Sequence, residues 1–364
     1  MSFRWKTTLI GVATAAVLAG SSEARELRIA PAAPPVHATY KAYEVFANEI
    51  KEASGGDLTA TILGPEVISL LQVKDAQQSG LADVASFILT YFPAGLDNTL
   101  IPDKLTMIAR EPYVMSLAFT DYIVNCAPCQ KEFKELGFVF LGAISTDGYK
   151  IIATKPIQSL EDLKGMRIRA GTPAHARWLE HFGAVPVRVS VPEVFESLSQ
   201  GSIDGSINGI SDIVSWRWID VMEGGLLIPL GSFFAASNFN MTADTWSSLS
   251  VDQRKIVADA AQHAVLQMTH QWGYVNPTAA FEAAKKKNVP LREPTADILA
   301  ASQEFIDADS KEQIEANGEL AVTFVGLMDK WSKIVDEVGG DLEALAARAQ
   351  SEIWDKVDLS TYGL

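Results

Sequence analysis

Two segments in the middle of the chain share one pattern, in which a short helix ends at a glycine and a strand begins. In the first, a helix that starts after Ser159 ends at Gly165, and residues 166–170 form the expected strand. In the second, a helix ends at Gly201, and residues 203–208 form the strand. Glycine ends helices because it adopts the left-handed conformation without steric cost. A chain that alternates helix and strand in this way is expected to fold as a sheet covered by helices.

Both strands end in a side chain suited to an anion. The first delivers the guanidinium of Arg169 and the second the amide of Asn208. A guanidinium is always charged, and its planar fork pairs with a carboxylate through two parallel hydrogen bonds. For any single arginine the alternative is a surface salt bridge, because functional charges are rare. We interpret the pair as a candidate carboxylate receptor.

The alternation of strand and helix extends over most of the chain and begins again near residue 140. Hydrophobic spacing predicts helices at 40–53, 73–80, 173–182 and from 251 to about 274, with mostly helical structure in the last 80 residues. Strands are predicted at 27–30, 58–63, 83–88, 142–145, 149–154, 185–189 and 289–291, and a long strand at 233–241 crosses between the two series. The expected fold class is α/β, a two-domain periplasmic-binding-protein clamshell with crossing strands and long C-terminal helices, and with the ligand in the cleft.

The expected domain organisation begins with a secretory signal peptide at residues 1–24. Arg4 and Lys6 precede an apolar run that is too short to span a bilayer, and small residues precede the expected cleavage after Ala24. We expect a soluble exported protein, located in the periplasm. The expected boundaries are 25–146 with 235–275 for domain I, 147–234 with 276–340 for domain II, and 341–364 for a helical tail.

The charge of the chain limits its partners. The formal net charge is −15 at pH 7, which argues against nucleic acid and anionic membrane surfaces. An anionic ligand therefore needs a local positive group, and Arg169 is the candidate. We expect no nucleic-acid partner and no cofactor, and we expect a monomer.

The two cysteines, Cys126 and Cys129, enclose an Ala-Pro dipeptide. In an exported protein the default interpretation is a structural disulfide, whereas redox activity, free thiols or a metal site are the alternatives. The second pair of ligands that a zinc site needs is missing from the sequence, and the five histidines show no metal-binding spacing. We therefore predict no metal site.

Several motifs occur together in an order that resembles the solute-binding subunits of tripartite ATP-independent periplasmic (TRAP) transporters, the DctP-type family. The resemblance runs from about Leu27 to Trp246. It rests on an N-terminal strand followed by a loop with proline and histidine, and on the motifs at 80–83 (GLAD), 163–169 (LKGMRIR), 182–186 (FGAVP), 192–194 (PEV) and 203–208 (IDGSIN).

The resemblance implies a two-domain protein that closes around one small organic anion and delivers it to the subunits of a TRAP membrane permease. It also implies that Arg169 pairs with the ligand carboxylate and that Asn208 lies in the cleft. Family members that bind sialic acid have a second arginine at the position of Tyr149. We therefore expect a ligand with a single anionic group, a monocarboxylate or a sulfonate.

Further cleft candidates are chosen for their hydrogen-bonding or aromatic side chains. For the aromatic residues the alternative is ordinary core packing, but as a group they favour a compact ligand that is partly apolar or carries a cation. The additional candidates are Thr172, Tyr149, Trp216, Tyr91, Phe234 and His37.

Three other functions are alternatives to solute binding for a TRAP permease. The nucleophile elbow, the Walker loop and the dinucleotide-binding glycine motif are missing from the sequence, so we predict that the protein is not an enzyme. A binding protein of an ATP-driven importer would share the clamshell. A thiol oxidoreductase that uses Cys126 and Cys129 is the third alternative.

Overall fold

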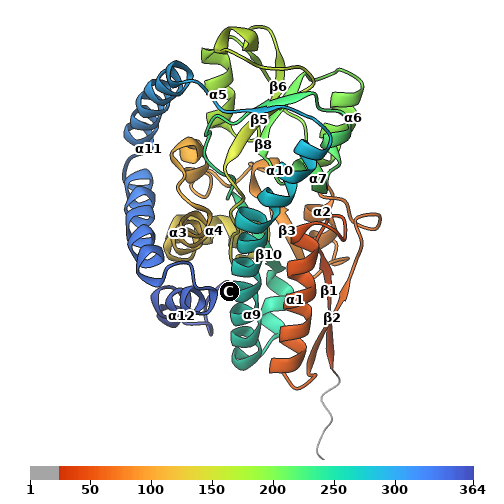
Figure 1. Ribbon diagram of the computed structural model, residues 1–364. Coiled ribbons are helices and arrows are strands. Elements are labelled where there is room, and N and C mark those ends of the chain that lie inside the picture. The colour runs from red at the N-terminus through yellow and green to blue at the C-terminus, as the bar shows by residue number, and fades with distance from the viewer. Residues whose placement is uncertain (1–23) are drawn as a thin grey trace, which may run out of the picture.

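The computed structural model describes residues 24–364, and the predicted signal peptide lies almost entirely outside this range. Two sheets organise the described chain. In Figure 1 the first sheet lies in the lower part of the molecule and the second in the upper part. The architecture is the mixed α/β class that the alternation of helix and strand predicts, and the boundaries of its two domains remain a prediction.

The first sheet has the strand order β2-β1-β3-β10-β4. Strands β1 (Arg25–Ala30), β2 (Leu58–Ile62) and β3 (Val84–Ile88) run parallel, whereas β10 (Ala236–Thr242) runs antiparallel to both β3 and β4 (Phe138–Val139). Because β10 follows β5 to β9 in the chain, the first sheet contains strands from both sides of the segment that forms most of the second sheet.

The second sheet has the order β11-β9-β5-β8-β6-β7. Its central strands β5 (Tyr149–Ala153) and β8 (Gly205–Gly209) are antiparallel, and β6 (Arg167–Arg169) is parallel to both β8 and β7 (Val185–Val187). On the other side of β5 lie β9 (Gly224–Leu226) and β11 (Leu291–Arg292), so the edge strands of the sheet are β11 and β7. The predicted helix stops at Gly165 and Gly201 are present, and both glycines have a positive φ.

Two extended segments, 140–148 and 227–235, carry the chain between the sheets and lie side by side. The backbone N–H of Thr146 donates to Phe233 O at 3.0 Å, and that of Tyr149 donates to Gly231 O. The strand predicted at 142–145 is part of the first segment and has no ladder partner. The strand predicted from residue 233 begins only at Ala236, because the residues before it belong to the second segment.

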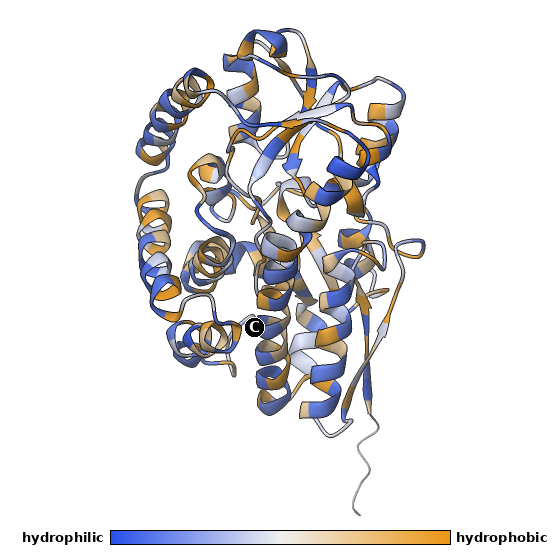
Figure 2. Ribbon diagram, in the orientation of Figure 1, coloured by the Kyte–Doolittle hydropathy of each residue, from blue (hydrophilic) through white to orange (hydrophobic). Residues whose placement is uncertain are grey.

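A nearly continuous helical path also joins the two parts. Helix α9 (Val251–His270) packs against α1 (Ala38–Ala53) beside the first sheet. It continues through a π-helical turn, η6 (Gln271–Val275), into α10 (Asn276–Lys286), which packs against α7 (Asp212–Ser215). Figure 2 shows that α1 and α9 carry hydrophobic and hydrophilic residues along their whole length, as expected for helices with one buried face.

The C-terminal helices cover one side of the molecule. Helix α11 (Ala296–Val338) runs along the left edge of Figure 1 past both sheets, and Gly318 breaks its helical geometry with a φ of 59°. Its second half packs on α3 (Pro112–Asn125), and α12 (Leu342–Glu352) packs against α9. None of the helices between residues 24 and 364 is long and apolar enough to cross a membrane.

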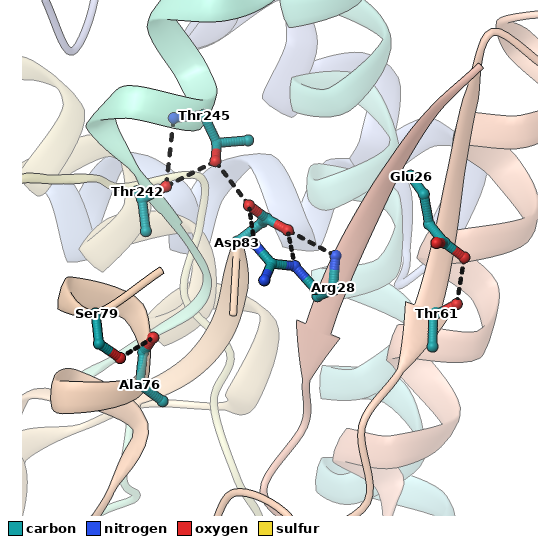
Figure 3. A network of polar contacts seen from close by, with 8 residues as sticks. All are labelled: Glu26, Arg28, Thr61, Ala76, Ser79, Asp83, Thr242 and Thr245. Carbon is teal, nitrogen blue, oxygen red and sulfur yellow. Dashed lines mark hydrogen bonds and ion pairs between the residues drawn. The ribbon is translucent and has the colours of Figure 1, made fainter. Parts of the chain in front are cut away.

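A polar network pins the start of β3 to β1 and to α8 (Ala243–Ser248), as Figure 3 shows. The Asp83 carboxylate accepts hydrogen bonds from the backbone N–H of Arg28 at 2.8 Å and from its Nε at 3.1 Å. The hydroxyl of Thr245 donates to the same carboxylate at 2.9 Å. Asp83, the last residue of the GLAD motif, therefore holds the sheet together and lies outside the cavity described below.

Candidate functional site: a closed cavity between the two sheets

A small cavity lies where strands of both sheets end. Its walls include residues at or just after the carboxyl ends of β1 and β3 in one sheet and of β6 in the other, which is where open α/β sheets usually bind ligands. The volume open to the centre of a water molecule is about 50 Å³. That volume corresponds to a few water molecules, since one needs about 10–15 Å³ by this measure. The two halves of the protein, each built around one sheet, are therefore close together at this point.

Arg169 is the charged group at the wall of this cavity. It is the last residue of β6, and only 3% of its surface is exposed. Its Nε donates to Val189 O at 2.9 Å, and Nη1 donates to Asn208 Oδ1 at 2.6 Å. Within residues 24–364 no carboxylate forms an ion pair with Arg169 and no acceptor bonds its Nη2. The guanidinium is thus held in place by neutral oxygen atoms while its charge lacks a counter-ion.

Asn208 connects Arg169 to a second charged group. It is fully buried in β8, and it is absent from the cavity wall. While its carbonyl accepts from Arg169, its amide Nδ2 donates to Asp212 Oδ2. Asp212 is the first residue of α7, and it lines the cavity. Its other oxygen, Oδ1, is buried and has no hydrogen-bond partner among the described residues.

His37 faces Asp212 from the first half of the protein. Its Nε2 lies 3.8 Å from Asp212 Oδ1, which is too far for a hydrogen bond. Its Nδ1 accepts the backbone N–H of Thr39 at 3.1 Å and so caps α1. Nδ1 is thus occupied as the acceptor of the cap, and Nε2 is the ring nitrogen that faces Asp212.

Two tryptophans enclose His37. The ring centroid of Trp272 lies 4.5 Å from that of His37, and the centroid of Trp216 lies 5.5 Å away. Both indole N–H groups are buried without a partner among the described residues. Trp272 reaches the cavity from the π-helical turn η6, where a Cβ on Gly273 would lie only 2.8 Å from Pro112. Such turns are often found at functional sites.

A second buried acid, Asp147, lies behind Asp212. The pKa of Asp147 is raised to about 7, chiefly by burial and also by the negative charge of Asp212, while a hydrogen bond from Ser211 opposes both effects. Its carboxyl group also accepts the backbone N–H of Ile210 at 2.7 Å. Asp147 therefore fixes the loop between β8 and α7 and so positions Asp212.

The structure brings most of the predicted site residues to one place. His37, Tyr91, Tyr149, Arg169 and Trp216 line the cavity, and Asn208 lies directly behind Arg169. Tyr91 accepts the backbone N–H of Val191 at 2.9 Å, a hydrogen bond that joins the two halves. Tyr149 stacks on His175, with ring centroids 5.4 Å apart.

Two predicted site residues lie elsewhere. Thr172 caps helix α5 (Pro173–His181) by accepting the backbone N–H of His175, and it does not line the cavity. Phe234 packs in the core between Phe119 and Phe324, while its neighbour Phe233 lines the cavity. Adjacent residues of an extended chain point in opposite directions, so only one of these two phenylalanines reaches the cavity.

The sequence prediction missed three acidic or aromatic residues of the site, Asp147, Asp212 and Trp272. Asp212 lies four residues after Asn208, and this spacing could have suggested it. Trp272 carried no such signal, because its segment continues the apolar pattern of α9. Cys126 and Cys129 are joined by a disulfide at the start of α4 (Ala127–Leu136), and neither residue lines the cavity.

The overall structure is similar to solved structures of TRAP solute-binding proteins. One is a marine metagenome protein specific for aromatic acid ligands, in complex with 3-hydroxybenzoate (TM-score 0.75, 20% identity, 85% of this chain and 99% of that chain covered). Another is a Rhodoferax ferrireducens protein in complex with copurified benzoate (TM-score 0.76, 19% identity, the same coverage). At this identity the likeness shows the fold alone.

Sequence comparison gives the family. The family described as bacterial extracellular solute-binding protein, family 7 (DctP), matches residues 118–317. Curated relatives include the C4-dicarboxylate-binding protein DctP of Shewanella loihica, 26% identical over 58% of this chain and 56% of its own length. The ectoine-binding protein TeaA of Halomonas elongata is 26% identical over 60% of this chain and 62% of its own. The chain thus spans less than two thirds of the length of these two relatives. Because the family model matches more than half of the chain, the chain belongs to the DctP family of TRAP solute-binding proteins.

Proposed function

We propose that this protein captures one small organic monocarboxylate in the closed cavity. The observation that carries the proposal is the guanidinium of Arg169, which is buried at the cavity wall without a counter-ion among the described residues. A buried charge that lacks a partner is costly. A ligand carboxylate would supply that partner and would accept two parallel hydrogen bonds from the guanidinium, one of them from the unused Nη2.

The balance of charges favours one carboxylate over two. Among the described residues that line the cavity, Arg169 is the only arginine or lysine. A second carboxylate would lose its hydration without gaining a cation, which disfavours dicarboxylates. The relatives differ in this respect, since one is named for C4-dicarboxylates and two of the similar structures hold benzoates. The cavity of this chain, with its tyrosine and tryptophan walls, supports the second kind of ligand.

Capture would occur by closure of the two halves. Arg188 Nη2 donates to Thr90 O at 3.1 Å, and with the Tyr91 contact this bond joins the halves in the closed form. A ligand held by Arg169 would add contacts to His37 and Tyr91, which come from the other half, and so favour closure. Family membership supports export to the periplasm through the predicted leader and delivery of the ligand to a TRAP permease.

A thermal-shift screen with matched acids tests the proposal. Butyrate and succinate have the same chain length and differ by one carboxylate. Benzoate and isophthalate share the same ring and also differ by one carboxylate. The monocarboxylate of each pair should raise the melting temperature more, because only a bound ligand stabilises the folded protein. The neutral ester methyl benzoate is the control and should produce no shift. Larger shifts with succinate and isophthalate would overturn the proposal.

A further inference from the structure

The carboxylate of Asp212 has a function still unaccounted for. Its Oδ2 holds Asn208 in the orientation that receives Arg169, but this contact needs only an acceptor and does not explain why an acid stands at position 212. The contact leaves Oδ1 buried at the cavity and without a hydrogen-bond donor among the described residues. A buried carboxylate oxygen that lacks a donor costs more than the hydrogen bond it fails to make. This oxygen is therefore free to accept a hydrogen bond from a bound ligand.

The neighbouring side chains do not supply that group. His37 faces this oxygen, but its Nε2 lies 3.8 Å away, beyond hydrogen-bond distance, and its Nδ1 is occupied by the cap of α1. Asp147 is itself an acid, and its two oxygens already accept from Ile210 and Ser211. The cavity wall thus holds one unpaired positive group and one unpaired negative group.

The two unpaired groups lie close together. A single amide side chain, that of Asn208, connects the Arg169 guanidinium to the Asp212 carboxylate. A ligand that satisfies both must carry its own opposite charges a few atoms apart. Trp216 and Trp272 stand beside His37 at the acidic end, and aromatic faces attract cations as well as apolar groups.

We propose that the ligand is a compact zwitterion, with a carboxylate bound by Arg169 and a positively charged, N–H-bearing nitrogen bound by Asp212 Oδ1. The inference rests on the proposed function, because it takes Arg169 as the carboxylate receptor. It narrows the substrate class from monocarboxylates in general to carboxylates that carry a protonated amine or amidine. A plain monocarboxylate would leave Asp212 buried and unpaired.

Pairs of acids with the same ring test the inference on the wild-type protein. Pipecolate and cyclohexanecarboxylate share a six-membered ring, and proline and cyclopentanecarboxylate share a five-membered ring. In each pair only the first carries a charged ring nitrogen. By calorimetry the nitrogen-containing acid should bind at least about tenfold more tightly, since a site with a buried polar group rejects a ligand that leaves the group unpaired.

Variants identify the group responsible. Asp212→Asn keeps an acceptor for Asn208 but removes the charge, and it should reduce the preference within each pair to about onefold or reverse it. Asp204→Asn is the matched control, because Asp204 precedes the same strand β8 and does not line the cavity. It should keep the wild-type preference. An unchanged preference in Asp212→Asn would overturn the assignment of Asp212.

The outcomes separate this inference from the proposed function. Equal or tighter binding of the two carbocyclic acids would overturn the zwitterion and leave the monocarboxylate site intact. Failure of all four acids to bind, with succinate or isophthalate binding instead, would overturn both. If Asp212→Asn does not fold, the comparison within the wild-type protein still decides, because it needs no variant.

Discussion

Each sheet contains a pair of parallel strands with the same arrangement of side chains at its start and a different one at its end. The strand pairs are β1 with β3 in the first sheet and β6 with β8 in the second. In each sheet an aspartate lies three residues after a glycine with positive φ and contacts an arginine on the neighbouring parallel strand. The aspartate carboxylate accepts the backbone N–H of that arginine at 2.8 Å and the arginine Nε–H at 3.1 Å. The pairs are Arg28 with Asp83 and Arg167 with Asp204.

The difference appears two residues further along. In the first sheet Arg28 is followed at this spacing by Ala30, whereas in the second Arg167 is followed by Arg169. The registers match, because Ala30 pairs with Ala85 and Arg169 with Ser206. Two positions beyond these partners the first sheet has Phe87 and the second has Asn208. One scaffold therefore ends in an apolar core in one half and in a charged receptor in the other.

Substitutions at the apolar end should lower the stability of the protein more than substitutions at the receptor end. Phe87 is fully buried against Phe92 and Phe138, with ring centroids 5.0 and 5.3 Å away. Phe87→Asn, which copies the second sheet, should lower the free energy of unfolding by about 4 kcal/mol through the cavity it leaves and the amide it buries. Denaturant unfolding measures this loss. A loss below about 1 kcal/mol would contradict the view that Phe87 is a core residue at the position where the second sheet has Asn208.

Substitutions at the receptor end should weaken ligand binding more than substitutions at the apolar end. Arg169→Ala should weaken binding of the best monocarboxylate or zwitterion roughly a hundredfold, or about 3 kcal/mol. Arg169→Lys should also bind poorly, because an ammonium cannot form the fork. Calorimetry on folded variants decides, with Arg167→Ala as the control on the same strand. Near wild-type affinity in Arg169→Ala would remove the proposed site.

The two arginine–aspartate pairs should differ in strength. Asp83 is buried and also receives Thr245, so Asp83→Ala should cost about 2 kcal/mol of unfolding free energy. Asp204→Ala should cost less, because its side chain is 24% exposed and solvent screens the pair with Arg167. Chemical denaturation of both variants ranks them. The reverse order would show that the two pairs are not equivalent parts of the scaffold.

The smallest effect should be a pH dependence at Asp204. Its hydrogen bond from Arg167 lowers the pKa of this carboxyl group in the folded protein. The stability it contributes is present above the pKa of an unfolded aspartate, about 4, and is lost as the pH falls through the lower folded pKa. Asp204→Asn should therefore unfold with a slightly weaker dependence on pH in this acidic range than the wild type. Identical acid-unfolding curves would count against the pair.

Sequence reasoning reached the parts of the site that local patterns determine. The glycine stops at 165 and 201 and the two strand ends predicted that Arg169 and Asn208 lie together, because parallel neighbours end at the same edge. The start of α1 was placed at residue 40, whereas the helix begins at Ala38, since the side chain of His37 caps it.

Contacts between distant segments set the limit of prediction. Trp272 lies more than 200 residues from His37 in the chain, and a helical turn of unusual geometry brings the two rings together. Phe233 and Phe234 could not be distinguished, because the crossing segment has no ladder from which to read the alternation of its side chains.

The π-helical turn that holds Trp272 has a consequence for how ligand preference can diverge among related proteins. A π-turn accommodates one more residue than an α-helical turn, and each residue of a helix rotates the chain by about 100°. Loss of a single residue within 271–275 would restore a regular helix, swing the indole away from the cavity and turn α10 relative to α9. At this point of the chain, a one-residue deletion would change the binding pocket more than most substitutions.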